Sequence, residues 1–142
     1  KAAVVLDPLV NLPASFDALG ARLDNAARLQ RAGVVVVFSM TGLAPHFAHK
    51  VRQSAGNAVA HGMPWDAALA GLTANPAAVF GLGASRGRIE TGMVADLVLW
   101  NGDPLEVTSA ADQVWVGGKP MSMRSRQTEL LDRYLPQATR QP

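Results

Sequence analysis

Three histidines are the residues of this sequence whose spacing could hold a metal ion. His46 and His49 lie three positions apart, so on a helix they would share one face and could bind the same ion. His61 would lie about four turns farther along that helix, too far away to complete the ligand set. The spacing therefore favours ordinary structural roles, with His46 capping the helix, His49 in solvent and His61 offsetting the helix dipole at the other end.

Other residue types exclude several classes of chemistry. The 142-residue sequence has no cysteine, which rules out a disulfide framework, a thiolate nucleophile and a cysteine-bound metal. The formal charge is only +2, and the scattered arginines have no interleaved aromatic residues, so we expect no nucleic-acid partner. No apolar run approaches the roughly 18 residues of a membrane span, so we expect no membrane partner and a cytoplasmic location by default.

The first half of the sequence alternates strand and helix patterns. Continuous apolar runs at residues 2–6 and 34–38 are typical of strands that are buried on both faces. Between them, Ser15 can cap a helix with apolar residues at spacings of three and four, and Gly33 can end it. Strand, helix and strand joined by short connections predict a right-handed βαβ unit with parallel strands.

The second half changes from helical to β-type patterns. A helix is expected at residues 46–61, closed by Gly62, and a second one from Pro64 until Asn75-Pro76 interrupts it. After a glycine-rich stretch, the expected elements are a strand at 97–100, a hairpin at 114–123 with its turn at Gly117-Gly118, and a short helix at 128–134.

Two segments of the second half resemble signatures near the carboxyl end of amidohydrolase-superfamily proteins. One is LTANPAAVFGL at residues 72–82, and the other is GRIETGMVADLVLW at residues 87–100, which resembles the family segment G-x-I-x-x-G-x-x-A-D-L-V-x-W. Residues 114–119 resemble the hairpin that usually follows. The similarity extends from about residue 15 to residue 123 and is greatest to the imidazolonepropionase-like and prolidase-like groups.

The resemblance implies an α/β fold made of the last two β/α units of a TIM-type barrel, followed by the carboxyl-terminal strands of a small β-sandwich. Residues 1–82 would form the barrel part, residues 83–123 the sandwich segment, and residues 124–142 a terminal helix and tail. Because the sequence opens inside a predicted strand, we expect a fragment whose first six barrel strands lie in a missing amino-terminal part. Asp96, in the second signature, is expected to bond backbone N–H groups, which is a structural role.

The resemblance also indicates where hydrolytic chemistry would lie. The family uses one or two divalent metals, usually zinc, held by a His-x-His, a bridging Lys or Glu, two later His and an Asp after the eighth barrel strand. Only that Asp would fall in this sequence, and Met40 or Thr41 occupies its position. Neither transfers protons as a carboxylate does, and Asp24 and Asp66 lie too far away to replace it. We therefore expect no catalytic residue, metal ligand or cofactor in this chain, with zinc possible in the full-length parent.

Candidate substrate contacts follow from the same resemblance, because barrel sites form at the carboxyl ends of the strands. They are Ser39, Thr41 and His46 after the second expected barrel strand, and Asn11 after the first.

The implied function is that of a carboxyl-terminal fragment of an amidohydrolase-like, metal-dependent hydrolase acting on amide or cyclic amide C–N bonds, inactive on its own. The alternative is a non-catalytic, amidohydrolase-derived scaffold or interaction module with a degraded metal site. Two barrel strands without neighbours expose hydrogen-bonding edges and apolar faces. We therefore expect the missing amino-terminal part of the parent as partner, or self-association through the exposed strand edges.

Overall fold

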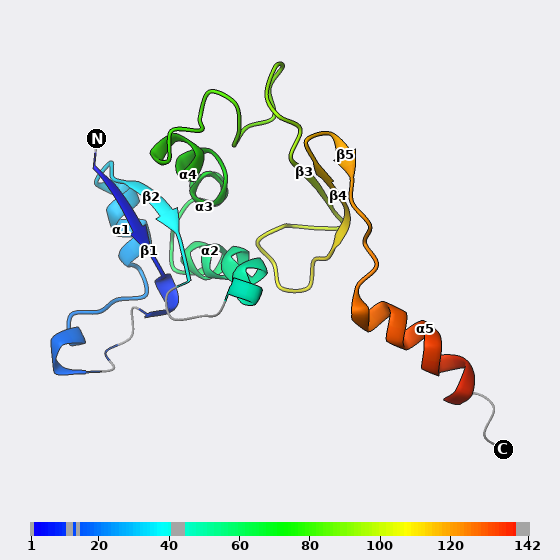
Figure 1. Ribbon diagram of the computed structural model, residues 1–142. Helices are drawn as coiled ribbons and strands as arrows, with labels where there is room; N and C mark the ends of the chain where they lie inside the picture. The colour runs from blue at the N-terminus through cyan, green and yellow to red at the C-terminus, as the bar shows by residue number, and fades with distance from the viewer. Residues whose placement is uncertain (1, 11–12, 14, 41–44, 139–142) are drawn as a thin grey trace.

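The computed structural model is an α/β structure built around two small sheets (Figure 1). It describes residues 2–10, 13, 15–40 and 45–138, except for the side chains of residues 45–47 and 136–138. The strands are β1 (Ala3–Leu6), β2 (Val35–Phe38), β3 (Leu97–Trp100), β4 (Ala111–Val116) and β5 (Lys119–Pro120). The α-helices are α1 (Asn25–Arg31), α2 (Val51–Ala60), α3 (Trp65–Leu72), α4 (Ala74–Val79) and α5 (Arg126–Ala138), and the short 3-10 helices are η1 (Pro8–Val10), η2 (Phe16–Ala18) and η3 (Pro45–Lys50).

The first sheet is the parallel pair β1 and β2. Its register places Ala3 opposite Val35 and Leu6 opposite Phe38. The valine run favours an extended chain in β2, because β-branched side chains are stiff at χ1 and pack well on a pleated surface. Helix α1 connects the two strands and packs against β2. The predicted strand, helix and parallel strand are therefore confirmed.

The two faces of this sheet are covered unequally. Val36 and Phe38 lie in the main hydrophobic core, and Leu6 packs against that core from β1. Side chains alternate along a strand, so Val5 lies on the opposite face, where it is 53% exposed. The prediction that the first strand is buried on both faces is wrong, because the described part of the chain leaves Val5 half uncovered.

Glycine ends α1 and α2 in the same way. Gly33 takes a φ of 78° after α1, and the next amide, that of Val34, donates to the Leu29 carbonyl at 3.1 Å. Gly62 repeats this arrangement after α2 with a φ of 92°. Positive φ is readily open to glycine, so both predicted helix ends are confirmed.

The helix predicted to start at Ser15 is shorter than expected. The Ser15 side chain makes no capping hydrogen bond, residues 16–18 form only the 3-10 turn η2, and α1 begins at Asn25. Phe16 and Leu19, which supplied the expected apolar face, are 92% and 69% exposed. An apolar stripe stabilises a helix through the surface it buries, and these two side chains bury little surface in this chain.

The break between α3 and α4 lies at Thr73, before the Asn75-Pro76 pair that was expected to mark it. Thr73 leaves the helical region, with φ −125° and ψ −83°. Pro76 has no N–H to donate to the Leu72 carbonyl, and its ring crowds that oxygen. The helix must therefore stop four residues before the proline, and Pro76 then lies in the first turn of α4.

The second sheet is the antiparallel order β3-β4-β5. Leu97 pairs with Trp115 across β3 and β4, and β4 turns into β5 through Gly117 and Gly118, whose φ values are 58° and 78°. Two consecutive residues with positive φ are what a tight two-residue hairpin turn requires. The predicted hairpin and its glycine turn are confirmed.

Asp96 connects this hairpin to the segment that precedes β3. One carboxylate oxygen accepts the Gly117 N–H at 2.8 Å, and the other forms an ion pair with Arg86. The expected bond to backbone is therefore confirmed, and the ion pair adds a side-chain partner that the sequence did not indicate.

Arg52 joins the helical part of the chain to the loop between β3 and β4. Its guanidinium donates to the carbonyls of Pro104 at 3.0 Å, Glu106 at 2.5 Å and Ser109 at 2.9 Å, and it stacks 4.9 Å from the centre of the Trp100 ring. Arginine suits this role because its planar group presents several fixed donors and also packs on aromatic faces. We call this set of contacts the Arg52 clamp.

Close packing supports the clamp on both sides. A Cβ placed on Gly56 of α2 would lie 2.3 Å from the Leu105 carbonyl oxygen, so only glycine permits this approach. Leu105 itself is buried in the main core, and the Trp65 Nε1 donates to the Asp103 carboxylate at 2.9 Å. The loop at residues 101–110 therefore rests against α2 and the start of α3.

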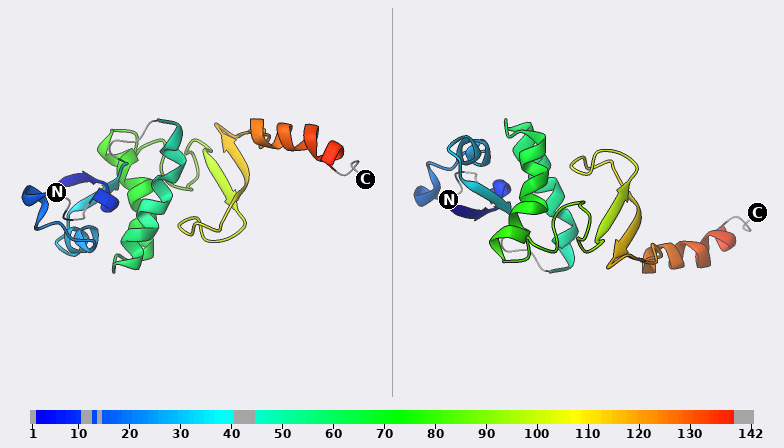
Figure 2. Two further views of the ribbon diagram at one scale, coloured as in Figure 1. Left: turned by 90° about the horizontal axis from the view of Figure 1, so that it is seen from below. Right: turned by 90° about the horizontal axis from the view of Figure 1, so that it is seen from above.

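Helix α5 extends from the second sheet away from the rest of the structure (Figures 1 and 2). Leu131, Tyr134 and Leu135 are each more than half exposed on it. Among the described residues, no helix is both long and apolar enough to cross a membrane.

Removing the Arg52 clamp should destabilise the protein. Arg52→Ala is expected to lower the free energy of unfolding by about 2–3 kcal/mol, because hydrogen bonds to a charged group contribute about 1.5–3 kcal/mol each and water replaces part of them. Arg52→Lys should recover little, because an ammonium group cannot span three carbonyls. Urea unfolding measures both, with Arg133→Ala on exposed α5 as the control. Equal stability of the Arg52→Ala and Arg133→Ala variants would contradict the clamp.

Gly56→Ala should be destabilising for a steric reason. The added methyl would overlap the Leu105 carbonyl, and such overpacking costs about 1–3 kcal/mol. Gly20→Ala is the matched control, because a Cβ there meets nothing within 4 Å. Thermal unfolding should show a clear loss of Tm for the first variant and none for the second.

Candidate functional site

The carboxyl ends of β1 and β2 lie side by side and form the candidate site. Leu6 pairs with Phe38, and the Ser39 N–H donates to the Leu6 carbonyl at 2.9 Å, one step beyond the strands. Pro8 has no N–H to continue the ladder, so the parallel pairing ends at this point. Asp7 and Ser39 are therefore neighbours where the two strands stop.

Asp7 is the residue of this site that sequence reasoning missed. Its side chain is 9% exposed, and it is the only charged residue that is buried within the described part of the chain. One carboxylate oxygen accepts the Leu9 N–H at 3.0 Å, which caps the short helix η1. Its place directly after a predicted strand was the available signal, but Asp7-Pro8 was interpreted only as the end of that strand.

The structure describes only some of the predicted site residues. Ser39 is half-buried beside Asp7, and Met40 follows it, also half-buried. Asn11 and Thr41 lie outside the described residues, and the backbone of His46 lies in η3 while its side chain is not described. Of the four candidate contacts, Ser39 is thus the one that the structure places at the strand ends.

The other two histidines lie on separate helical segments. His49 is exposed at the end of η3. His61 follows α2, and its Nδ1 lies 2.7 Å from the Asn57 carbonyl oxygen. Among the side chains that the structure describes, which do not include that of His46, no three His, Asp or Glu residues form a group that could hold a metal ion.

Asp24 is paired with an arginine that lies two positions before it in the sequence. Its carboxylate forms an ion pair with Arg22 at 2.7 Å, just before α1. The hydrogen bond from Arg22 lowers the pKa of Asp24 below its ordinary value, so this carboxyl favours its charged form. It therefore stabilises a turn and does not supply the acid that is absent after β2.

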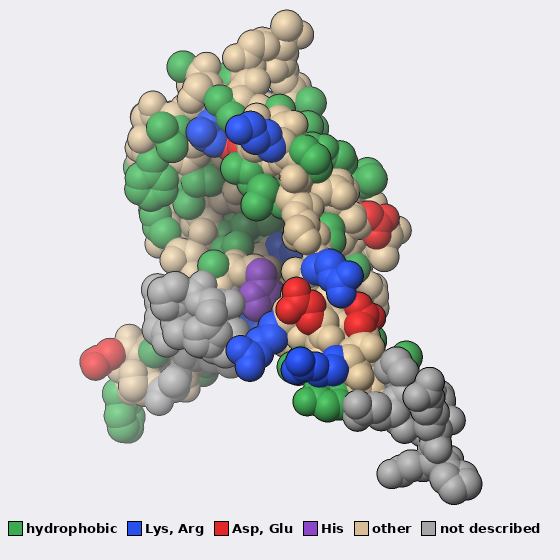
Figure 3. Space-filling model, turned by 45° about the vertical axis from the view of Figure 1, so that its right-hand side comes forward, with side chains coloured by type: hydrophobic (Ala, Val, Ile, Leu, Met, Phe, Trp, Pro, Cys, Tyr) green, Lys and Arg blue, Asp and Glu red, His purple; other side chains and the backbone are tan. Residues whose placement is uncertain are grey.

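Polar groups gather on one face of the molecule (Figure 3). A histidine side chain there borders a hollow, with Lys, Arg, Asp and Glu side chains close by. Apolar side chains cover much of the surface above that hollow in the same view.

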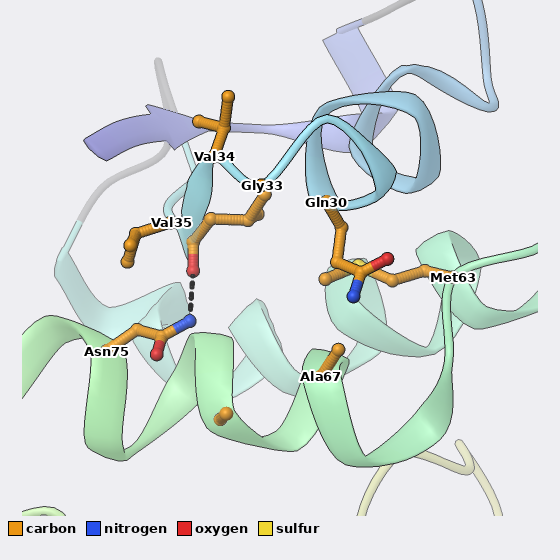
Figure 4. Close-up of a pocket in the computed structure, with 9 residues that line it drawn as sticks. Gln30, Gly33, Val34, Val35, Met63, Ala67 and Asn75 are labelled. Atoms are coloured by element: carbon orange, nitrogen blue, oxygen red, sulfur yellow. Dashed lines mark hydrogen bonds between the residues drawn. The ribbon is translucent and has the colours of Figure 1, made fainter. Parts of the chain in front are cut away.

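A cavity of about 270 Å³ lies at the opposite end of β2 (Figure 4). Apolar side chains including Val35, Met63 and Ala67 line it, together with the amides of Gln30 and Asn75, and none of its lining residues is ionisable. Such a lining offers packing space and hydrogen bonds, but no group for proton transfer.

Asn75 borders that cavity and forms a hydrogen bond to the edge of β2 that does not face β1. Its amide donates to the Val36 carbonyl at 2.9 Å. Val35 donates its N–H to the Ala2 carbonyl of the neighbouring strand, so the adjacent Val36 carbonyl points to the other edge. A side chain from α4 therefore satisfies one backbone group that no described strand covers.

Comparisons with known proteins agree on one family. The model of the amidohydrolase family matches residues 18–121. The amidohydrolase tasK of Hapsidospora irregularis is 47% identical over 58 residues, which are 41% of this chain and 6% of that protein.

Two solved structures share the fold. An amidohydrolase from Thermotoga maritima MSB8 matches with a TM-score of 0.74 and 28% identity, over 86% of this chain and 32% of the other. An adenosine deaminase from Xanthomonas campestris, solved with bound zinc, matches in fold with a TM-score of 0.58 and 21% identity, over 96% of this chain and 37% of the other. This chain thus spans about a third of the length of either structure.

Asn75→Ala should weaken the edge of β2. The Val36 carbonyl would lose its donor, and an unsatisfied, partly buried acceptor costs about 1–3 kcal/mol. Asn57→Ala is the matched control, since the exposed Asn57 amide donates to the Gln53 carbonyl of its own helix. Chemical unfolding should separate the two variants, and an equal effect of both would contradict the role of Asn75.

Proposed function

This chain belongs to the amidohydrolase family, and we propose that it forms the last two β/α units of that family's barrel with the carboxyl-terminal strands of its small β-sandwich. The parallel β1–α1–β2 unit and the separate antiparallel sheet support this assignment. Residues 1–82 would belong to the barrel, residues 83–123 to the sandwich, and residues 124–142 to a terminal helix and tail. Residues 72–82 and 87–100 favour the imidazolonepropionase-like or prolidase-like group.

The proposed activity is hydrolysis of amide or cyclic amide C–N bonds by the full-length protein. The observation that carries it is the family match over residues 18–121, which includes β2 and the Ser39 position at its carboxyl end. Barrel enzymes assemble their sites from residues at the carboxyl ends of several strands. Two strands contribute here, so the site would be completed by strands from the rest of the protein.

The described residues of this chain do not by themselves fit a divalent metal. They contain no group of three ligand side chains, and Met40 or Thr41 occupies the position where the family carries an Asp. A bound zinc would lower the pKa of a water molecule toward neutrality, and its ligands would come from the rest of the protein. The chain alone would therefore be inactive.

The partner that fits best is the remainder of the same barrel. Val5 is half exposed on the side of the sheet that faces away from the main core, and among the described strands β1 pairs with β2 alone. An exposed strand edge has unpaired N–H and C=O groups that can pair with a further strand, and an apolar face can be buried against it. The alternative partner is a second copy of this chain that pairs through the same strand edges.

A non-catalytic scaffold is the second candidate function. The observation that favours it is the absence of an acid at Met40 and Thr41, the family's metal-binding position. An intact His-x-His after an apolar strand upstream would favour the enzyme, and its absence would favour the scaffold.

Assays of the 142-residue chain and of its parent polypeptide test the proposal. Peptide mapping and intact mass of the parent identify the upstream sequence, and both proteins are then assayed with added zinc on a panel of N-acyl amino acids and cyclic amides. We expect hydrolysis by the parent and none by the chain alone. Turnover by the chain, lost on His46→Ala or His49→Ala, would overturn the assignment of the site to the whole barrel. An inactive parent without a His-x-His would favour the scaffold.

A further inference from the structure

The segments that follow β1 and β2 both rest on helix α2. Segment η1 comes shortly after β1 and packs against α2, and η3 ends at Lys50, directly before the first residue of α2. In barrel enzymes, segments at the carboxyl ends of the strands carry the groups that contact substrate. The position of this one helix therefore sets the placement of two segments at the candidate site.

Another side of α2 is held by the loop at residues 101–110 (Figure 1). Arg52, in the first turn of α2, donates to three backbone carbonyls of that loop at 3.0, 2.5 and 2.9 Å. The loop is itself ordered by the Asp103 carboxylate, which accepts the Leu105 N–H at 2.8 Å and the Trp65 Nε1–H at 2.9 Å. Arg52 thus binds a set of acceptors that other contacts already hold in place.

Buried packing makes the loop and α2 move together. Leu105 is 5% exposed and belongs to the same core cluster as Ala55 and Ala58 of α2. A Cβ on Gly56 would lie 2.3 Å from the Leu105 carbonyl oxygen, so the two backbones are in close contact. Because closely packed interiors transmit strain, a displacement of the loop would displace the first half of α2 with it.

The contacts of Arg52 indicate how it can act on the site. Its guanidinium binds the carbonyls of the loop and stacks 4.9 Å from the centre of the Trp100 ring, so its partners belong to the second sheet and its loop. We infer that Arg52 is a positioning residue for the hydrolytic site of the full-length protein, an inference that rests on the proposed function. It holds α2 against the second sheet and thereby fixes where η1 and η3 lie at the strand ends.

Measuring kcat and stability together in the full-length protein tests this inference. Arg52→Ala should lower kcat by about tenfold or more at a temperature where the variant is fully folded, because a misplacement of about 1 Å can cost about 10²-fold. Arg52→Lys should not recover kcat, since one ammonium group cannot bind three carbonyls. Gly56→Ala displaces the same loop from α2 by overlap with Leu105 and should lower kcat as well.

Asn75→Ala is the matched control, because it removes a hydrogen bond near the amino-terminal end of β2 and leaves the Arg52 clamp intact. It should lower Tm to a similar extent but keep kcat within about twofold of the wild type. Hydrogen exchange gives a second measurement that does not depend on turnover. The amides of residues 9–10 and 46–50 should exchange faster in Arg52→Ala than in Asn75→Ala.

The outcomes separate this inference from the proposed function. A folded Arg52→Ala variant that loses no more kcat than Asn75→Ala would show that Arg52 only stabilises the protein, which overturns the inference and leaves the proposed function standing. Unchanged exchange at η1 and η3 would also overturn it. A wild type that hydrolyses no amide of the panel would defeat the proposed function and any effect on kcat, while the exchange rates would still decide whether Arg52 holds η1 and η3 in place.

Discussion

The parallel ladder between β1 and β2 is the constraint on which the rest of the structure depends. It fixes which side chains meet the helices, since Val36 and Phe38 enter the main core while Val5 is left on the far side. It also brings the ends of two distant segments together, because Leu6 pairs with Phe38 and Asp7 then adjoins Ser39. The same ladder that creates the candidate site leaves β1 without a further described strand beside it and one face partly uncovered, which is why we propose the rest of a barrel as the partner.

The Arg52 clamp determines how the second sheet meets the helices. Its three backbone acceptors lie 52 to 57 positions farther along the chain, and together they hold the loop at residues 101–110 against α2. Gly56 allows the Leu105 carbonyl to approach, and Leu105 joins the main core. The antiparallel sheet is therefore tied through its loop to the helix that follows the candidate site.

Sequence patterns predicted elements well where a local rule decides the conformation. The valine run of β2, the helix ends at Gly33 and Gly62, and the hairpin at Gly117-Gly118 were all predicted and confirmed. Predictions were wrong where packing decides the outcome, as for the helix expected from Ser15, whose apolar residues Phe16 and Leu19 bury little surface. At the candidate site, Ser39 was predicted, and Asp7 was missed because a strand end and a buried carboxylate have the same local sequence pattern.

The sequence by itself determined the family, the order of the main elements and the absence of an acid at Met40 and Thr41. These properties depend on residue identity and short-range spacing, which can be seen without knowing how the chain folds. Only the tertiary structure decided which strand face is covered, which carbonyls Arg52 binds, and that Asp7 is buried beside Ser39. Each of these depends on contacts between segments some thirty or more residues apart, and the free energy of such contacts comes from burial and hydrogen bonding that no local pattern encodes.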